Sequence, residues 1–220
     1  MSETRRRMTL VLGTIGLSLA WDVLAALGAW GPWAAFAMTG ILLAIFGLYM
    51  AFTRDQLIGR LLFFGLVVGL GELLSDHWAV SVSRTLVYAD WGPRIWDSPL
   101  YMPLSWIVVI AQLGFVARWL DQRWGLLAAV AGATVAGALN IPFYEFLADK
   151  AGFWYYRDCW KILGCTPVYV IAGEATLTAV LPLMLRGVAR GGWLRILGLG
   201  LLQALWIWLV CARLCYALFG

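Results

Sequence analysis

Seven long apolar stretches dominate the pattern of hydrophobic and polar positions along the chain. They cover roughly residues 8–30, 33–52, 59–80, 99–119, 124–148, 166–186 and 193–218. Each is close to the ~20 residues that a helix needs to cross the hydrocarbon core of a bilayer. The pattern therefore predicts an all-α, polytopic membrane protein, in which seven transmembrane helices form a single domain over residues 1–220.

Composition agrees with this prediction and narrows the function. The chain is 63% hydrophobic and 13% charged, whereas a soluble domain carries about 25% charged residues. A separate soluble domain is thereby excluded. The formal net charge is +4, but the basic residues are dispersed among short loops. We therefore expect membrane lipids as partners and no nucleic acid.

Arginine and lysine positions predict the orientation of the bundle. With the N-terminus inside, the inner loops hold Arg5, Arg6, Arg7, Arg54, Arg60, Arg118, Arg123, Arg186, Arg190 and Arg195. The outer loops hold only Arg84, Arg94, Lys150, Arg157 and Lys161. This bias follows the positive-inside rule. It predicts a cytoplasmic N-terminus and an outside C-terminus, in a bacterial inner membrane or the endoplasmic reticulum.

Two segments of the chain read as copies of one unit. The shared pattern is E-x-L-x-D, then Y-x-D-(x)-W, then [ST]-P-x-Y. It occurs at residues 72–76, 88–91 and 98–101, and again at 145–149, 156–160 and 166–169. Each copy includes two spans, helices 3–4 and helices 5–6, so the two copies are parallel repeats. Repeats of this kind usually place a site at their pseudo-twofold interface.

Acidic residues are among the matched positions of this repeat. Glu72 and Asp76 share one helix face, as do Glu145 and Asp149. Glu174 lies inside the sixth span. Ionisable groups within a span usually face a cavity or one another, so we expect an outward-opening cavity near the outer face. Its candidate catalytic residues are Glu72, Glu145, Glu174, Asp76 and Asp149.

Two further expectations concern how the helices pack. Asp22 in the first span and Arg213 in the last lie at similar depth, which favours an ion pair between them. Helix 5 carries small residues at four-residue spacing, Ala129, Ala133 and Gly137. Small residues on one stripe let helices approach closely, and this predicts a central place for helix 5 in the bundle.

Aromatic side chains gather at the same outer end as the carboxylates. An interfacial aromatic belt explains most of them, but the inner end has far fewer. The candidate substrate-binding residues are Trp78, Tyr88, Tyr101, Trp106, Tyr144, Trp154 and Tyr169. A carboxyl group away from water stays protonated and can act as a general acid. Aromatic faces would then stabilise a carbocation formed from a lipid-soluble alkene or epoxide.

At these residues the chain resembles the small integral-membrane carotenoid and terpenoid cyclases. These are the lycopene-cyclase-like proteins, the related carotenoid hydratases and the seven-helix meroterpenoid cyclases. The resemblance covers about residues 60–186 and rests on Glu72, the run from Ser98 to Trp106, Glu145 and the segment from Pro167 to Glu174.

The resemblance implies a terpene cyclase of isoprenoid biosynthesis, a lyase or isomerase that uses general acid–base chemistry. It implies an isoprenoid substrate, no cofactor and no metal, and Glu72 as the first candidate acid. The meroterpenoid cyclases also depend on a carboxylate late in the chain. Here Glu174 is the last acidic residue, so the second catalytic role is not assigned by the resemblance.

Other functions remain open from the sequence. The chain could be a carotenoid hydratase or isomerase, a proton-coupled small-molecule transporter, or a non-catalytic assembly subunit. A metal site would use the carboxylates with His77, the only histidine. Cys159 and Cys165 lie in an outer loop, where they would form a disulfide or stay reduced.

Overall fold

The computed structural model of the protein describes residues 2–220 and contains seven helices that are long and apolar enough to cross a membrane. These helices are α1 (Glu3–Gly28), α2 (Pro32–Thr53), α3 (Gln56–His77), α4 (Tyr101–Trp124), α5 (Leu126–Ala151), α6 (Val168–Arg190) and α7 (Trp193–Trp206). Two π-helical segments, η1 (Trp78–Val82) and η2 (Ile207–Leu214), prolong α3 and α7, and a short α8 (Cys215–Phe219) follows. The third and seventh spans are therefore Gln56–Val82 and Trp193–Phe219. The predicted seven-helix, all-α bundle is confirmed.

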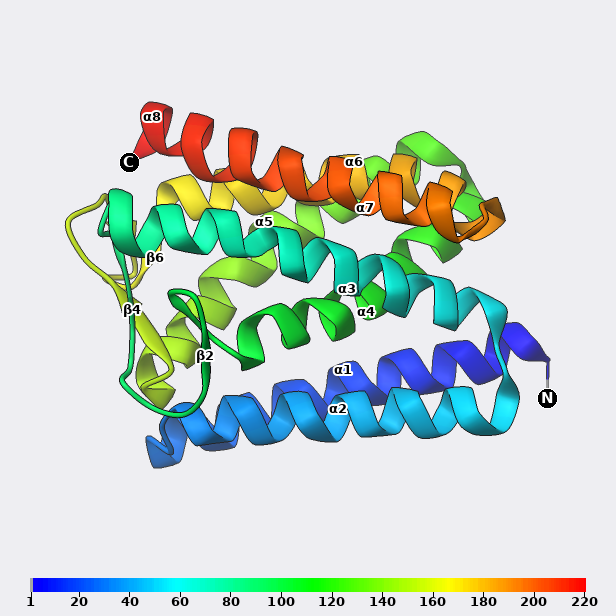
Figure 1. Ribbon diagram of the computed structural model, residues 1–220, viewed down its shortest axis with the longest axis horizontal. Helices are drawn as coiled ribbons and strands as arrows, with labels where there is room; N and C mark the ends of the chain where they lie inside the picture. Colours follow the sequence, from blue (N-terminus) through cyan, green and yellow to red (C-terminus); the bar gives the residue numbers. More distant parts are fainter. Residues whose placement is uncertain (1) are drawn as a thin grey trace.

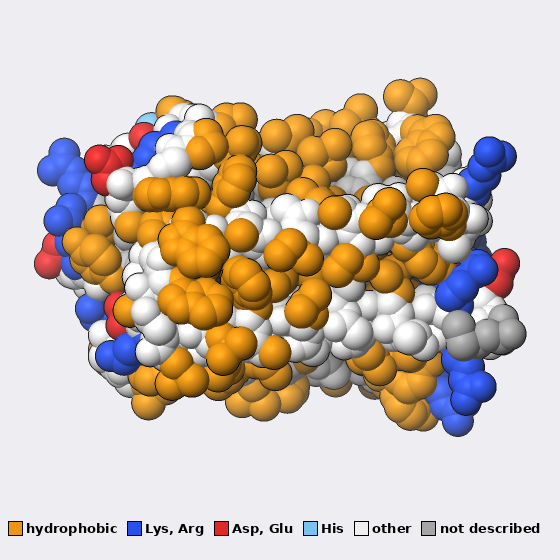
Figure 2. Space-filling view, turned by 90° about the horizontal axis from the view of Figure 1, so that it is seen from below, with side chains coloured by type: hydrophobic (Ala, Val, Ile, Leu, Met, Phe, Trp, Pro, Cys, Tyr) orange, Lys and Arg blue, Asp and Glu red, His pale blue; other side chains and the backbone are white. Residues whose placement is uncertain are grey.

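The helices lie side by side along the long axis, and the two ends of the chain lie at opposite ends of the bundle (Figure 1). On the face seen in Figure 2, hydrophobic side chains form a broad band across the middle of the molecule, while charged side chains collect at its two ends. Because large apolar side chains such as Phe52, Leu127 and Leu194 are almost fully exposed, this band is suited to lipid and not to water. The chain is an integral membrane protein.

Six short strands close one end of the bundle, which we call the strand end. They are β1 (Leu86–Tyr88), β2 (Arg94–Ile95), β3 (Ser98–Pro99), β4 (Trp154–Tyr156), β5 (Lys161–Ile162) and β6 (Thr166–Pro167). β2 pairs with β3 and β5 pairs with β6, while β1 pairs with β4 across the two connections. We call the opposite end, where the termini of α2, α4 and α6 meet the start of α1, the arginine-rich end (Figure 1).

The internal repeat is visible as two units with the same order of elements. The first unit is α3–β1–β2–β3–α4, and the second is α5–β4–β5–β6–α6. In the antiparallel pair that joins them, Leu86 lies opposite Tyr156 and Tyr88 opposite Trp154, with Val87 and Tyr155 at the centre. The matched residues of the two units therefore exchange places about Val87 and Tyr155, as a pseudo-twofold axis requires.

One insertion separates the two units. In the first unit the interval runs from Glu72 to Tyr88, and in the second it runs from Glu145 to Tyr156. The interval of the first unit is five residues longer. The π-helical segment η1 is five residues long and lies within this interval. Insertions into helices commonly appear as π-bulges, often at functional sites. The unequal gaps of the sequence repeat therefore correspond to an extension of α3.

Helix packing within each unit is the most extensive in the molecule, α3 against α4 and α5 against α6. α3 also packs against α7, and α1 lies mainly against α5. The prediction that helix 5 is central is wrong, because α3 and α4 bury a far larger share of their spans than α5 does. The small residues of α5 allow close approach on one side only. There a Cβ atom at Gly137 would lie 2.9 Å from the Glu174 carbonyl oxygen.

Candidate functional site

The carboxylates of the first unit are buried where α3 meets the strands. Asp76 is 4% exposed, and its Oδ2 atom accepts hydrogen bonds from the Tyr88 hydroxyl at 2.7 Å and from Ser98 Oγ at 2.5 Å. Because Tyr88 ends β1 and Ser98 begins β3, these two bonds attach both strands to α3. Through this one oxygen, Asp76 holds the loop over the helix end.

Glu72 lies one helical turn below Asp76 and differs from it in one respect. It is 6% exposed, and Asp76 and the Trp106 indole are its polar neighbours. Its second oxygen, Oε2, is buried and has no hydrogen-bond partner among residues 2–220. A buried carboxyl oxygen without a partner is costly and uncommon in proteins. Glu72 therefore has a free acceptor or donor position inside the bundle.

Close helix packing places the Trp106 side chain beside Glu72. Gly69 lies against α4, where an added Cβ atom would stand 2.9 Å from the Trp106 Cβ. A residue larger than glycine at position 69 would push α3 and α4 apart. The absence of a side chain there lets the α4 aromatic residue reach the α3 carboxylate.

Glu145 is the matched residue of the second unit, and both of its oxygens are engaged. Oε2 accepts from Trp154 Nε1 at 2.7 Å, and Oε1 accepts from the Tyr156 hydroxyl at 3.3 Å. The side chain is 5% exposed. Both donors lie on β4, so Glu145 fastens this strand to α5.

The other predicted carboxylates lie around these two glutamates. Glu174 on α6 is a charged neighbour of both Glu72 and Glu145. Asp149 is half-buried near the end of α5 and has no side-chain hydrogen bond among the described residues. Of the five predicted catalytic residues, Glu72, Asp76 and Glu145 are buried and Glu174 is half-buried beside them, while Asp149 lies nearer the end of α5. We call Glu72, Asp76, Glu145 and Glu174 the carboxylate cluster.

The expected ion pair between Asp22 and Arg213 is not formed, and that prediction is wrong. α1 packs against α5, whereas η2, which carries Arg213, packs against α6 and α3. The Arg213 guanidinium lies over the Trp208 ring, 5.5 Å from its centroid. Asp22 instead lies near Tyr144 at the edge of the carboxylate cluster. The prediction matched the depths of Asp22 and Arg213 in the membrane, but the helices that carry them are not neighbours.

Six of the seven predicted aromatic residues surround the carboxylate cluster. Tyr88, Trp106 and Trp154 contact the carboxylates as described, and the Tyr144 ring lies 5.8 Å from Trp154. Tyr169 exchanges a hydrogen bond of 2.9 Å with Thr85. The matched Tyr101 hydroxyl is buried without a partner among residues 2–220. Trp78 lies apart from them, since it packs against Tyr216 with 4.9 Å between ring centroids.

Three polar residues of the site were not predicted. Ser98 and Tyr156 both occur in the repeated motif, so their recurrence was a usable signal. Thr85 lies just before β1 and outside the motif, and no pattern in the sequence indicates it. All three supply hydroxyl groups that fasten strands to helices or to each other.

The two tyrosines that donate to the carboxylates keep their protons. Burial raises the pKa of the Tyr88 phenol well above its ordinary value, and the nearby Asp76 and Glu72 carboxylates raise it further. The Tyr156 pKa is raised by burial first and then by Glu145. Both hydroxyl groups therefore act as hydrogen-bond donors at any physiological pH.

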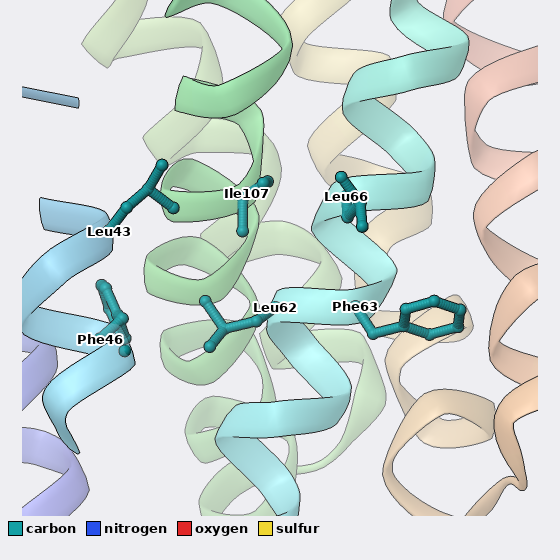
Figure 3. A pocket seen from close by; sticks show the side chains of 7 residues that line it. Leu43, Phe46, Leu62, Phe63, Leu66 and Ile107 are labelled. Atoms are coloured by element: carbon teal, nitrogen blue, oxygen red, sulfur yellow. The ribbon is translucent and has the colours of Figure 1, made fainter. Parts of the chain in front are cut away.

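The carboxylate cluster is covered and does not form the outward-opening cavity that we predicted. Tyr88 and Trp154 extend from the paired strands β1 and β4 over the carboxylates, and both are less than 8% exposed. Two hollows lie elsewhere. One is charged and lies between the ends of α4 and α6. The other is apolar and lies between α2, α3 and α4, lined by Leu43, Phe46, Leu62, Leu66 and Ile107 (Figure 3).

His77 is engaged outside the carboxylate cluster. Its Nδ1 atom lies 2.5 Å from Asp97 Oδ2, and its ring stacks on Trp96 at 4.1 Å. Ser81 donates to the same Asp97 oxygen at 2.8 Å. Within residues 2–220, no three His, Cys, Asp or Glu side chains are grouped as a metal ion would need. Cys159 and Cys165 are both free thiols in the structure.

Comparison with known proteins identifies a family but no activity. No curated protein and no solved structure matches the chain. The profile of a family described as a domain of unknown function (DUF6989) matches residues 73–219, which is more than half of the chain and includes most of both units. The protein therefore belongs to the DUF6989 family.

Proposed function

We propose that this protein is an acid–base enzyme of the membrane that acts on an isoprenoid lipid, with Glu72 as the proton donor. The observation that carries the proposal is the unpartnered Oε2 atom of Glu72, buried beside a second carboxylate. A protonated carboxyl with a free oxygen can transfer its proton to a reactant, whereas a carboxylate whose oxygens both accept hydrogen bonds is less available.

Asp76 is the proposed partner of Glu72. It is held in place by Tyr88 and Ser98, so its position does not depend on the reactant. Two carboxyl groups this close share a proton more readily than both ionise. Glu174 faces both glutamates from α6 and is the proposed acceptor of the proton that ends the reaction.

The reaction would proceed through a carbocation. Glu72 adds its proton to an alkene carbon, the cation closes a ring or shifts, and a neighbouring carbon loses a proton to a carboxylate. The product is then an isomer of the substrate, as expected of a cyclase. The faces of Trp106, Tyr101 and Tyr144 supply aromatic surface near the carboxylates. Capture of the same cation by water would give a hydratase.

The apolar hollow is suited to the hydrocarbon part of such a substrate. Its volume is about 280 Å³, it lies between α2, α3 and α4 (Figure 3), and Leu66 on its wall is an exposed apolar side chain. Leu66 on its wall lies six residues before Glu72 on α3, about 9 Å along the helix axis. Ile107 on its other wall is adjacent to Trp106. The hollow therefore supports approach of a chain from lipid toward Glu72.

Deuterium incorporation tests the proposal without a known substrate. Membranes that contain the protein are incubated in heavy water with a lipid extract rich in acyclic isoprenoids, and the lipids are analysed by mass spectrometry. Protonation of an alkene by Glu72 places one deuterium on carbon. Cyclisation then yields deuterated isomers, while hydration yields products heavier by one water.

Glu72→Gln membranes are the matched control, because glutamine keeps the shape of the side chain and removes its acidity. We expect no deuterated product from this variant, with the protein still folded. The same deuterated products at the same rate from Glu72→Gln membranes would overturn the proposal. We also propose that the arginine-rich end faces the cytoplasm. This orientation would place the carboxylate cluster near the outer leaflet.

A further inference from the structure

The charged hollow at the arginine-rich end is built differently from the rest of that end. It lies between the last turns of α4 and α6, and its lining residues are Arg118, Asp121, Gln122, Arg186 and Arg190. Its volume is about 460 Å³. Three guanidinium groups and one carboxylate thus meet in one depression, which gives the lining a net positive charge.

Asp121 orients two of the three arginines. Its side chain is 4% exposed, and it accepts from Arg186 Nε at 3.0 Å and Nη2 at 2.7 Å. Arg118 Nη1 donates to the same carboxylate at 3.2 Å. A bidentate pair of this kind holds a guanidinium plane in a defined direction. The donors that Asp121 does not use are therefore preorganised.

Unused donors remain in the hollow. The Arg118 side chain is only 14% exposed, and its buried Nε atom has no hydrogen-bond partner among residues 2–220. Arg190 is exposed and forms no ion pair with any described residue. By contrast, nearby Arg60 donates to the Ala189 carbonyl. Arginine that serves only to orient a membrane protein needs neither a shared hollow nor an aligning carboxylate.

We propose that this hollow binds a phosphate-bearing anion, the headgroup of an anionic membrane lipid. Guanidinium groups in a fork geometry match phosphate oxygens, and basic pockets between transmembrane helices are known to hold anionic headgroups. Basic side chains gather beyond the edge of the apolar band, at the level where headgroups lie (Figure 2). A lipid phosphate reaches this level with its acyl chains still in the band.

The arginines must supply the affinity. The C-terminal ends of α4 and α6 carry the negative pole of each helix, which disfavours an anion. Removal of one unpaired guanidinium should therefore have a clear effect. Arg190→Gln is the most direct variant, because its exposed side chain supports no contact of the fold. Gln122→Glu tests the same charge balance by adding an acid to the wall of the hollow.

The experiment uses the full chain in a neutral maltoside detergent. Dihexanoyl phosphatidylglycerol, dihexanoyl phosphatidylcholine and inorganic phosphate are each titrated, and bound ligand is counted by native mass spectrometry. We expect phosphatidylglycerol to bind in preference to phosphatidylcholine. Arg190→Gln and Gln122→Glu should each weaken that binding about fivefold. Arg5→Gln removes one exposed charge at the same end, outside the hollow, and should leave the affinity unchanged.

Four outcomes decide the proposal. Equal binding of phosphatidylglycerol and phosphatidylcholine overturns it, as does unchanged phosphatidylglycerol affinity in both hollow variants. An equal loss in Arg5→Gln also overturns it, because it assigns the binding to overall charge. Displacement of phosphatidylglycerol by inorganic phosphate at similar concentration supports the anion site but assigns it to a soluble phosphate.

Discussion

The two units of the repeat hold the same glutamate in different states. In the second unit, Glu145 accepts one hydrogen bond at each oxygen, from Trp154 and Tyr156. In the first, Glu72 has a buried oxygen with no partner among the described residues. A duplicated unit can therefore keep one copy as scaffold while the other carries a reactive group. The position in the repeat alone does not say which copy does which.

Two local differences account for the two states. The residue two positions before each matched tyrosine is Trp154 in the second unit and Leu86 in the first, so strand β1 carries no indole at the position from which Trp154 donates. The five-residue segment η1 also shifts β1 relative to α3. Tyr88 consequently bonds Asp76, one helical turn beyond Glu72, whereas Tyr156 bonds Glu145.

The largest expected effect is a difference in the rate of product formation between variants of the two glutamates. Under the proposed function, Glu72→Gln should slow product formation by about 10²–10⁴-fold, the usual contribution of a general acid. Glu145→Gln keeps an oxygen for one of its two donors and should slow it far less. The measurement is the rate of deuterated product formation at equal amounts of folded protein. Equal losses in the two variants would erase the functional difference between the units.

A second variant tests the scaffold role of the second unit. Trp154→Phe removes the indole donor and leaves a buried Glu145 oxygen unpaired, so it should lower the free energy of unfolding by about 1–3 kcal/mol. Unfolding by dodecyl sulfate in mixed micelles gives this quantity. Tyr155→Phe lies next to it on β4 with its side chain exposed and should change stability little. Similar losses in both variants would argue against the specific bond.

Loss of one hydrogen bond to Asp76 should lower the free energy of unfolding less than loss of the Trp154 bond, because Asp76 keeps a second donor. Tyr88→Phe leaves Ser98, and Ser98→Ala leaves Tyr88. Each single variant should lower the free energy of unfolding by about 1 kcal/mol. The double variant should lose more than the two single losses combined, since Asp76 then has neither donor. Strict additivity in the same micelle assay would show that the two donors act independently.

The smallest effect concerns a bond that only the first unit has. His77 holds Asp97, and this hydrogen bond is the main reason that the pKa of Asp97 is lowered. A carboxyl whose pKa is lower in the folded protein stabilises it above the ordinary pKa, about 3.9 for aspartate, and loses this contribution as the pH falls through the folded value.

Asp97→Asn should therefore be less stable than the natural protein near neutral pH, and the difference should disappear in acid. Thermal unfolding followed by tryptophan fluorescence over a series of pH values measures it. The second unit has Cys165 and Lys150 at the matched positions and offers no equivalent titration. A difference that grew in acid would contradict the assigned contact.

The sequence was sufficient for the helices and for the repeat. The length of an apolar run determines whether a helix can cross the membrane. The repeat was detectable because the two units keep the same short motifs in the same order. The strands were not predicted, because pieces of two or three residues such as β2 leave no alternation to detect. The pairing of Asp22 with Arg213 failed because hydropathy gives depth but not which helices are neighbours.

The candidate site was predicted in part for the same physical reason. Four of the five acidic residues were placed together by their depth and helix face. Which of Glu72 and Glu145 has hydrogen-bond partners for its buried oxygens depends on the shift introduced by η1 and on a single indole. A sequence motif indicates neither of these. Thr85 lies outside every pattern and is visible only through its bond to Tyr169.

The pairing of β1 with β4 has a consequence for how a reactant would arrive. Because Tyr88 and Trp154 cover the glutamates, a reactant has no direct access to them from the aqueous phase. A lipid substrate would have to enter laterally, between helices. Under the proposed function, turnover would then follow the mole fraction of substrate in the bilayer and not its total amount in the sample. Dilution of the membrane with inert phospholipid would slow such an enzyme, while addition of buffer would not.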